Sequence, residues 1–428
     1  MCRQLIYPGF AISTLILSLV SPTEAGDWIG FRGGEHYGFA SAENLPVSWG
    51  DNENILWKFE LPGLGSSSPI VVGDRLFITC YSGYAELIEE PGEMDNLRRQ
   101  IVCLDKTSGD VLWTKTIAPV LPESRYSPGN DSRHGYASST PTSDGERLYV
   151  QFGKTGVYCF DLDGTQRWQA VVGSGTHGWG SGMSPLLAGD LLIVNASVES
   201  ESLIGFDKRT GKEIWRTDGI KKCWSSPVLV DTEEGREVIL NLPKKLAAFD
   251  PTTGEELWHC DGIPDNYVCP SPIVHGGIIY AIGGRKNTTI AVRPGGRGDV
   301  SESHVLWRAN KGSNVSSPVF VEGNLFWLHE SRGIAYCLDA ETGEVIYEER
   351  LSPRPGLIYS SITAANGKLY ALSQDNGAYV LATNPDEMEQ LAVNSFESDT
   401  SRCNGSVAIV DNRLYLRTDK AIYCIGYN

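Results

Sequence analysis

Two histidines, His134 and His177, are the side chains best suited to acid–base chemistry, because imidazole titrates near neutral pH. Each lies in a long connection between predicted strands, 118–139 and 173–183. The sequence places neither a carboxylate nor a nucleophile beside them, so a hydrogen-bonding or surface role is the alternative to catalysis. His-Glu-x-x-His, P-loop and Gly-x-Ser-x-Gly motifs are absent from the sequence, and we predict no metal site.

A second group of residues could bind an anionic, partly planar ligand, because guanidinium and ammonium groups supply charge and aromatic rings supply stacking surface. The alternative interpretation is that loops are polar in any case, since Glu199, Glu201, Glu330, Asp375 and Asp419 occur in the same class of loop. The predicted ligand-binding residues are Arg125, Arg133, Tyr136, Trp179, Trp224, Lys245, Arg285, Asn314, Arg332, Tyr359 and Arg402.

The elements that must position these residues follow from an internal repeat. A proline preceded by serine or threonine is followed seven residues later by an apolar residue, usually with an aromatic residue next to it. After the first copy the period is 42 to 46 residues, which is typical of β-propeller blades. The copies begin at Pro69, Pro141, Pro185, Pro272 and Pro318, and Pro227 opens another copy that the acidic insert Asp231–Glu234 lengthens. Two further copies keep the spacing with Ile362 and Val407 in place of proline.

The second half of each repeat carries a turn signature. The pattern predicts a strand that ends in Asp, a tight turn with a glycine at positive φ, and a strand that bears one large aromatic anchor for packing against the neighbouring blade. The turn is degenerate in the fifth and seventh repeats, near 293–307 and 383–396. The regular copies are Asp105…Gly109…Trp113, Asp161…Gly164…Trp168, Asp207…Gly211…Trp215, Asp250…Gly254…Trp258 and Asp339…Gly343…Tyr347.

These repeats predict an all-β fold, an eight-bladed β-propeller of four-stranded antiparallel blades with strands A to D from the axis outward. The eighth repeat ends one strand short, and Ile55–Phe59 has the pattern of an unpaired D strand. We therefore expect the N-terminal strand to complete the last blade, which removes open sheet edges. We expect residues 54–428 to form the ring and residues 26–53 to form an extension that packs on it. The D–A and B–C connections should share one face around the channel, with the candidate residues on them.

The Asp-x-x-Thr-Gly-x-x-x-Trp repeat resembles that of pyrroloquinoline quinone (PQQ)-type propellers, which include the quinoprotein dehydrogenases and the BamB outer-membrane assembly propeller. The segment Asp27–Gly34, with Trp49 and 54–58, also resembles the start of secreted PQQ-like propellers of planctomycete-type bacteria. For a dehydrogenase, the resemblance implies PQQ, calcium, axial carboxylates and, in many members, an adjacent Cys-Cys pair. No Cys-Cys pair occurs in this sequence.

The N-terminus indicates export. Residues 1–25 read as a secretory signal, with Arg3 before an uncharged apolar run and Ala25 at the end. No Leu-x-x-Cys lipobox follows that run, and no later segment approaches transmembrane length. The formal net charge of −17 disfavours nucleic-acid binding. We expect a periplasmic or secreted protein that is a monomer.

The ten cysteines divide into two groups. One group shares a strand position that holds Gly205, Ala248 and Ala291 in sister repeats, so this position requires a small residue and its thiols should be buried; its members are Cys103, Cys159, Cys337 and Cys424. The sequence leaves disulfide pairing open for the second group, Cys80, Cys223, Cys260, Cys269 and Cys403.

Two functions are compatible with these patterns. The first is a non-catalytic scaffold without a cofactor, whose loop-bearing face binds a protein, a peptide or a cell-envelope saccharide. The second is a PQQ- and calcium-dependent dehydrogenase that acts on an alcohol or a sugar. Because the axial loops offer more cations than carboxylates and the strongest patterns are packing patterns, we predict the scaffold and retain the dehydrogenase as the alternative.

Overall fold

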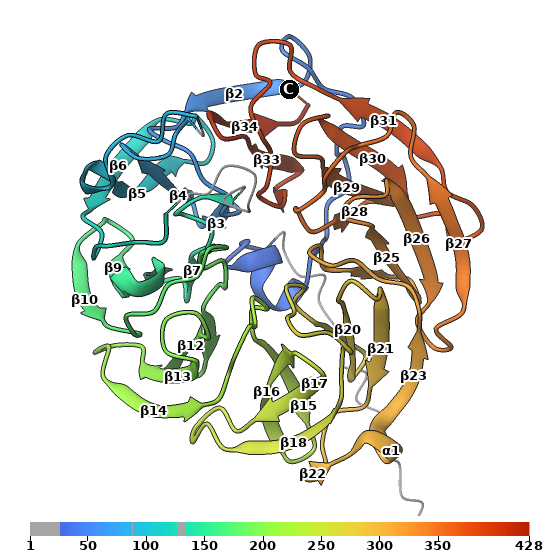
Figure 1. The fold of residues 1–428 in the computed structure, drawn as a ribbon. Helices are drawn as coiled ribbons and strands as arrows, with labels where there is room; N and C mark the ends of the chain where they lie inside the picture. The colour runs from blue at the N-terminus through green and yellow to red at the C-terminus, as the bar shows by residue number, and fades with distance from the viewer. Residues whose placement is uncertain (1–25, 88, 126–133, 428) are drawn as a thin grey trace, which may run out of the picture.

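The computed structural model describes residues 26–87, 89–125 and 134–427. Within them the strands form eight sheets around a central axis, and the chain follows the ring from one sheet to the next (Figure 1). The predicted all-β, eight-bladed propeller is confirmed. The predicted signal peptide, residues 1–25, and the candidate Arg133 lie outside the described residues. None of the described helices has the length and apolar character needed to cross a membrane.

Each blade has its first strand near the axis and its last strand at the rim (Figure 1). Blades 1 to 4 contain β3 (Ile70–Val72), β4 (Arg75–Ser82), β5 (Arg98–Asp105) and β6 (Val111–Ile117); β7 (Thr142–Ser143), β8 (Arg147–Gln151), β9 (Val157–Asp161) and β10 (Gln166–Ala170); β11 (Leu186–Ala188), β12 (Leu191–Ala196), β13 (Ser202–Asp207) and β14 (Glu213–Asp218); and β15 (Val228–Thr232), β16 (Gly235–Leu242), β17 (Lys245–Phe249) and β18 (Glu256–Asp261).

Blades 5 to 8 continue the same order. They contain β19 (Ile273–His275), β20 (Ile278–Gly283), β21 (Thr288–Val292) and β23 (Val305–Ala309); β24 (Val319–Val321), β25 (Asn324–Leu328), β26 (Ile334–Asp339) and β27 (Val345–Arg350); β28 (Thr363–Ala365), β29 (Lys368–Leu372), β30 (Ala378–Ala382) and β31 (Gln390–Asn394); and β32 (Ala408–Val410), β33 (Arg413–Arg417), β34 (Ala421–Ile425) and β2 (Ile55–Glu60). The short helices among the described residues are η1 (Phe31–His36), η2 (Met94–Asn96), η4 (Gly153–Thr155) and α1 (Ser301–His304).

The N-terminal strand closes the ring. Strand β2 pairs antiparallel with β34, with Trp57 opposite Cys424, so the first and last strands of the propeller share blade 8. This confirms the prediction made from the missing D strand, and the two ends of the ring are held together by a sheet ladder.

The tryptophan at the D strand joins each regular blade to the next. Its indole Nε1 donates a hydrogen bond of 3.0–3.1 Å to the carbonyl oxygen that follows the Asp of the next blade's turn, and the turn glycine lies against the indole ring. A Cβ on these glycines would come within 2.3–2.9 Å of the ring, so the turn excludes a side chain. The donor and acceptor pairs are Trp57 and Lys106, Trp113 and Leu162, Trp168 and Lys208, Trp215 and Pro251, and Trp307 and Ala340.

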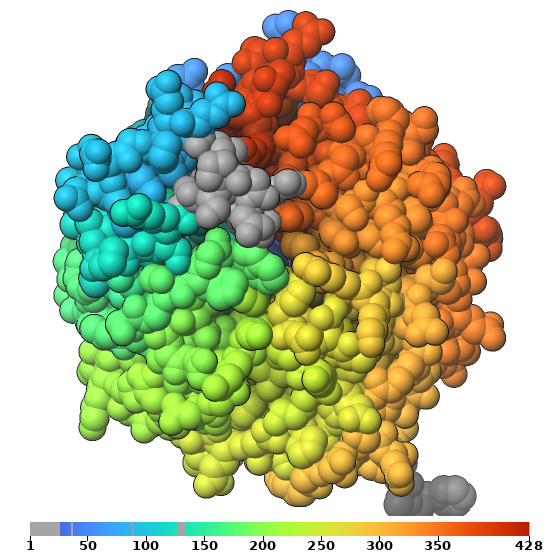
Figure 2. All heavy atoms as spheres, in the orientation of Figure 1, coloured from blue at the N-terminus to red at the C-terminus, as the bar shows by residue number. Residues whose placement is uncertain are grey.

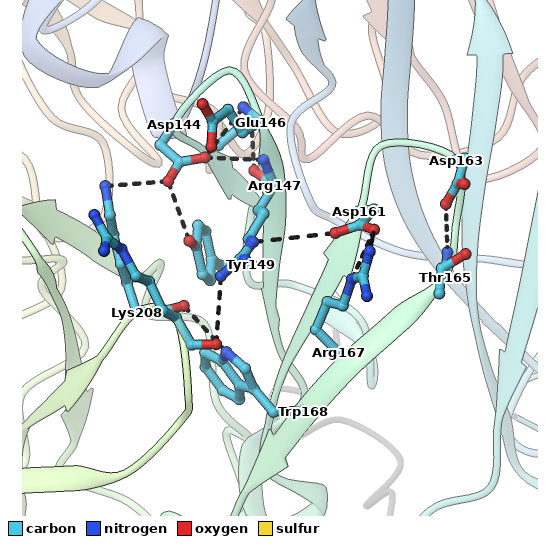
Figure 3. A network of polar contacts seen from close by, with 12 residues as sticks. Asp144, Glu146, Arg147, Tyr149, Asp161, Asp163, Thr165, Arg167, Trp168 and Lys208 are labelled. Carbon is cyan, nitrogen blue, oxygen red and sulfur yellow. Dashed lines mark hydrogen bonds and ion pairs between the residues drawn. The ribbon is translucent and has the colours of Figure 1, made fainter.

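Figure 3 shows the contact between blades 2 and 3 in detail. The indole of Trp168 reaches the carbonyl oxygen of Lys208, and the ammonium of Lys208 lies 3.1 Å from Asp144 Oδ2. Tyr149 donates its hydroxyl to the same carboxylate oxygen at 3.2 Å. Apolar packing and charge-assisted hydrogen bonds therefore hold the two blades together at the same place.

The small-residue position in strand C has a geometric cause. Each of its residues lies directly opposite the D-strand aromatic ring in the antiparallel ladder, as with Cys103 opposite Trp113 and Gly205 opposite Trp215. A Cβ on Gly205 would approach the Trp215 ring to 2.3 Å. The predicted burial of the four cysteines at this position is confirmed, and all nine described cysteines, including the five disulfide candidates, are free thiols.

Blade 4 departs from the regular pattern because the next blade lacks the Asp turn. Trp258 instead donates its Nε1 hydrogen to Glu237 Oε2 at 2.8 Å. The degenerate connection of blade 5 forms β22 (Gly298–Asp299) and α1, and β22 pairs in parallel with the outer edge of β18. The additional strand thus covers the rim where the regular turn is missing.

Blade 7 lacks the D-strand ring altogether. Ala392 occupies its position, opposite Val380 rather than opposite a small residue. The indole of Trp49, from the N-terminal extension, lies 6.3 Å from the ring of Tyr370 on β29. D-strand rings in other blades lie at 5.8–6.5 Å from the equivalent B-strand ring. Trp49 therefore supplies the aromatic anchor that blade 7 lacks.

The N-terminal extension also closes the axis. Helix η1 lies at the centre of the ring (Figure 1). Before the helix, Trp28 forms a backbone bridge with Val71 in blade 1. After the helix, strand β1 (Phe39–Ala40) pairs with β28 in blade 7. The guanidinium of Arg32 is buried and donates to the carbonyl oxygens of Pro318 and Ile362 at 2.5 and 3.3 Å. Burial without a carboxylate partner lowers the pKa of Arg32 to about 9.

Candidate functional site

A cavity of about 280 Å³ lies on the axis, where the D–A connections of all eight blades end. Figure 2 shows the corresponding face, with a hollow between the segments that converge on the centre. Phe31 of η1 lines the cavity at the axis, and Arg285 reaches it from the connection between β20 and β21. The structure thus brings residues far apart in the sequence to one axial pocket, as expected for a propeller.

One wall of the axial pocket is aromatic. The rings of Trp179 and Trp224 have centroids 5.0 Å apart, and Tyr267 lies 4.8 Å from Trp179 in an edge-to-face arrangement. His177 packs edge-on against Trp224 at 4.9 Å. Trp224 is fixed by a 2.9 Å hydrogen bond from Nε1 to the carbonyl oxygen of Gly180. The three connections before blades 3, 4 and 5 therefore support one another through this wall.

Polar groups connect the aromatic wall to the next blade. The hydroxyl oxygen of Tyr267 accepts hydrogen bonds from Arg285 Nε at 3.0 Å and from Asn314 Nδ2 at 2.8 Å. The Arg285 guanidinium also lies 5.5 Å from the centroid of the Tyr267 ring, within cation–π range. The backbone N–H of Asn314 is in turn accepted by Glu330 at 3.0 Å. This chain of contacts places a positive charge at the pocket.

The two histidines have different surroundings. His134 lines the axial pocket, and its Nδ1 lies 2.5 Å from the hydroxyl oxygen of Ser138 in the same connection. The Ser138 hydroxyl also donates to the backbone carbonyl of His134 at 2.7 Å, as in a local turn. His177 accepts the backbone N–H of Trp179 at Nδ1, and burial, with a smaller effect of Lys222, lowers its pKa.

A closed ring of hydroxyl groups surrounds the axis deeper in the pocket. The residue before each repeat's proline position donates its backbone N–H to the hydroxyl oxygen of the equivalent residue in the next blade, at 2.9–3.0 Å. The last bond, from Ser406 to Ser68, completes the circle. All eight residues line the axial pocket: Ser68, Thr140, Ser184, Ser226, Ser271, Ser317, Ser361 and Ser406.

A buried acid supports the connection that carries Trp179. Glu199 accepts a hydrogen bond from the Ser181 hydroxyl at Oε1, while its Oε2 is buried without a partner among the described residues. Burial raises the pKa of Glu199 to about 7, and the hydrogen bond from Ser181 only partly opposes this effect. Nearby, Arg99 and Glu123 form a buried ion pair at 2.6 Å.

The structure places the thirteen predicted residues in different environments. Six line the axial pocket: His134, Trp179, Trp224, Arg285, Asn314 and Tyr359. His177 packs edge-on against Trp179 and Trp224 without lining the pocket, and Tyr136 packs against Tyr81 and Tyr84. Lys245 forms a 2.6 Å ion pair with Glu256 on β18 instead of facing the pocket. Arg125, Arg332 and Arg402 also do not line it, and Arg133 lies outside the described residues.

The sequence-based prediction omits two features of the pocket. It treats the residue before proline only as a mark of the repeat, although a hydroxyl residue occurs there in all eight copies, including the two without proline. It also omits Phe31, because nothing in the sequence shows that the N-terminal extension enters the axis. The recurring hydroxyl residue is a sequence signal from which these eight pocket residues could be predicted. The sequence contains no comparable signal for Phe31.

Comparison with known proteins places this architecture in a family. The sequence model of the family described as outer membrane protein assembly factor BamB matches residues 97–349 and 299–425. The chain belongs to this BamB-type family of PQQ-like propellers. No curated protein matches the chain in sequence.

Solved structures of the BamB-type propeller and its structural relatives share the fold. BamB from Moraxella catarrhalis is 13% identical, with a TM-score of 0.59 over 87% of this chain and 97% of that one. The quinohemoprotein alcohol dehydrogenase ADHIIG from Pseudomonas putida HK5 is 11% identical, with a TM-score of 0.60 over 95% and 76%. The designed protein Ika8 is 12% identical, with a TM-score of 0.56 over 86% and 98%. At these identities the likeness concerns the fold alone.

The donor set of the axial pocket can be compared with that of a calcium-bound quinone. Calcium takes six to eight oxygen ligands, among which carboxylates are prominent. The described residues that line the pocket include no Asp or Glu, and within the described chain no three His, Cys, Asp or Glu side chains are grouped closely enough to hold a metal ion. The described lining therefore does not match the ligands that calcium takes.

Proposed function

We propose that this protein is an exported, monomeric, non-catalytic scaffold that binds a protein or peptide partner in the axial pocket and on the surrounding connections. The observation that supports this most directly is the composition of the pocket. It combines half-buried rings of Trp179, Trp224 and Tyr267 with hydroxyl groups and the charge of Arg285, and its described lining has no carboxylate. Aromatic and arginine side chains dominate the binding energy of many interfaces.

The family supports a protein as the partner rather than a small substrate. The matching family is described as an outer membrane protein assembly factor, and an assembly factor acts on other proteins. A cell-envelope saccharide is the other ligand class suited to aromatic platforms. The alternative function, a PQQ- and calcium-dependent dehydrogenase, would require carboxylates for calcium and for a base, and these are absent from the described lining.

Site-specific photocrosslinking tests the scaffold function. Replacing Tyr359 in the pocket with p-benzoylphenylalanine should give discrete protein adducts in envelope extracts, and the additional change Trp224→Ala should remove them. The same crosslinker in place of Tyr427, which is 47% exposed and lies outside the pocket, is the matched control and should give none of these adducts. Identical adducts from both positions, or adducts that do not depend on Trp224, would contradict the proposal.

A reconstitution experiment tests the alternative. The mature chain is incubated with PQQ and calcium, passed through a desalting column, and examined for quinone absorbance and for dye reduction with alcohols and aldoses. We expect no substrate-dependent dye reduction. Stoichiometric quinone with substrate-dependent dye reduction would refute the non-catalytic function.

A further inference from the structure

The eight hydroxyl groups of the ring have hydrogens that no acceptor among the described residues takes. Each oxygen accepts a backbone N–H from the preceding blade, but none of the eight hydroxyls donates a hydrogen bond to any described residue. The eight residues are between 1% and 6% exposed. All of them line the axial pocket, so eight buried donors surround one cavity.

Buried donors require acceptors, because leaving one unsatisfied destabilises the protein. The described lining offers no carboxylate that could take these hydrogens. Acceptor oxygens that enter the pocket, either as water or as part of a ligand, can take these hydrogens. A sugar hydroxyl brings a donor with each acceptor, whereas a carboxylate brings only acceptors and so matches a ring of donors better.

The remaining lining agrees with a negatively charged group on an apolar body. Arg285 contributes a positive charge, and Trp179, Trp224 and Tyr267 contribute ring surface. Helix η1 lies at the centre of the ring (Figure 1) and its Phe31 lines the pocket, so the pocket admits the end of a ligand better than a continuous chain.

We propose that the hydroxyl ring binds a carboxylate whose apolar or aromatic body packs against Trp179, Trp224 and Tyr267. This inference rests on the proposed function, in that it assumes the axial pocket to be the binding site. The carboxylate has two sources, the C-terminus of a polypeptide and a small organic acid. One buried acceptor of the lining, Asn314 Oδ1, has no partner among the described residues, and the N–H next to a peptide's terminal carboxylate could satisfy it.

Calorimetry with 3-phenylpropionate and 3-phenylpropionamide at pH 7.5 tests the preference for charge without any mutation. We expect the acid to bind at least about tenfold more tightly than the amide, since charge-assisted hydrogen bonds are about twice as strong as neutral ones. Equal affinity for the acid and the amide would overturn the proposal. If neither probe binds, and no peptide with a C-terminal carboxylate binds, the proposal is also overturned and water is the occupant of the ring.

Two hexapeptides that end in Phe, one with a free carboxylate and one with a C-terminal amide, distinguish the two sources. Binding of the free-carboxylate peptide alone supports a polypeptide C-terminus. Binding of 3-phenylpropionate but of neither peptide supports a small acid, and it counts against the protein partner of the proposed function without affecting the carboxylate site. Crosslinking that depends on Trp224, with no preference for any carboxylate, would instead sustain the proposed function and refute the ring as a carboxylate site.

A matched pair of variants tests the ring itself. Ser317→Asp and Ser317→Asn each retain an oxygen that can accept the backbone N–H of Ser271, and they differ in charge. The acidic variant should abolish binding of 3-phenylpropionate, because its carboxylate occupies the ring, while the amide variant should bind the acid measurably. Equal affinity of the two variants for the acid would show that the ring does not sense charge and would overturn the proposal.

Discussion

Replacing Trp49 with alanine should destabilise a blade that Trp49 does not belong to. The side chain is 4% exposed and lies against Tyr370 in blade 7, where Ala392 leaves the D-strand position empty. Burial of a tryptophan removes roughly 150–250 Å² from water. At about 25 cal/mol per Å² this corresponds to about 4–6 kcal/mol, an upper estimate because unfolded chains bury part of their surface. We therefore expect Trp49→Ala to lower the free energy of unfolding by about 3–5 kcal/mol.

Urea unfolding followed by far-UV circular dichroism measures this effect against two controls. Trp113→Ala removes a D-strand ring from blade 1 and should cost a similar amount, because that ring holds the equivalent position. Trp179→Ala removes a half-buried ring from the axial pocket and should cost clearly less. If Trp49→Ala is no more destabilising than Trp179→Ala, Trp49 does not replace the missing ring, and the extension is held to blade 7 by its backbone pairing alone.

Three further predictions concern the ring, a buried acid and the thiols. Ser317→Ala leaves the backbone N–H of Ser271 without an acceptor and should cost about 1–3 kcal/mol in urea unfolding, whereas Ser317→Thr should cost little, because threonine occupies the equivalent position in blade 2. Burial raises the pKa of Glu199 from 4.5 to about 7, so between these pH values the folded protein keeps a proton that the unfolded chain releases. The free energy of unfolding of the wild type should therefore decrease, by on the order of 3 kcal/mol, as the pH rises from about 4.5 to 7. Unfolding of Glu199→Gln over the same pH range should lack this decrease, and an unchanged pH dependence would contradict the raised pKa. The nine described cysteines are free, so the mature protein unfolded in urea without reductant should titrate nine thiols with Ellman's reagent, and a lower number would reveal a disulfide.

The propeller could be predicted from the sequence because its determinants recur at fixed intervals. The Asp, Gly and Trp of the turn occur within one repeat, but they act between blades, where the indole of Trp168 meets the turn of the next blade at Lys208. Repetition allows such a long-range contact to be recognised from local spacing. The missing D strand could be assigned to Ile55–Phe59 for the same reason, because a ring has only one place left for it.

Features that occur once could not be predicted in this way. Trp49 and Phe31 belong to a segment without a repeat, so their spacing does not indicate which blade or cavity they reach. The direction of a long side chain is also not set by its place in the repeat. The sequence predicts Lys245 at the channel face, but Lys245 is the first residue of β17 and pairs with Glu256 at 2.6 Å. Candidate residues were therefore predicted best where the backbone itself approaches the axis, as at Trp224 and Asn314.

The hydroxyl ring shows why a structural explanation of a repeated residue does not exclude a functional one. Each hydroxyl oxygen uses a lone pair to accept a neighbouring backbone N–H, and this requirement alone explains why serine or threonine recurs in every blade. Aspartate could also accept that N–H, but ionised aspartate has no hydrogen to donate, whereas a hydroxyl still has one after it has accepted. Since the eight positions line the axial pocket, satisfying the backbone leaves eight hydroxyl hydrogens around the channel. The structural role is tested by removing the acceptor, as in Ser317→Ala, and the binding role by keeping the acceptor and changing the charge.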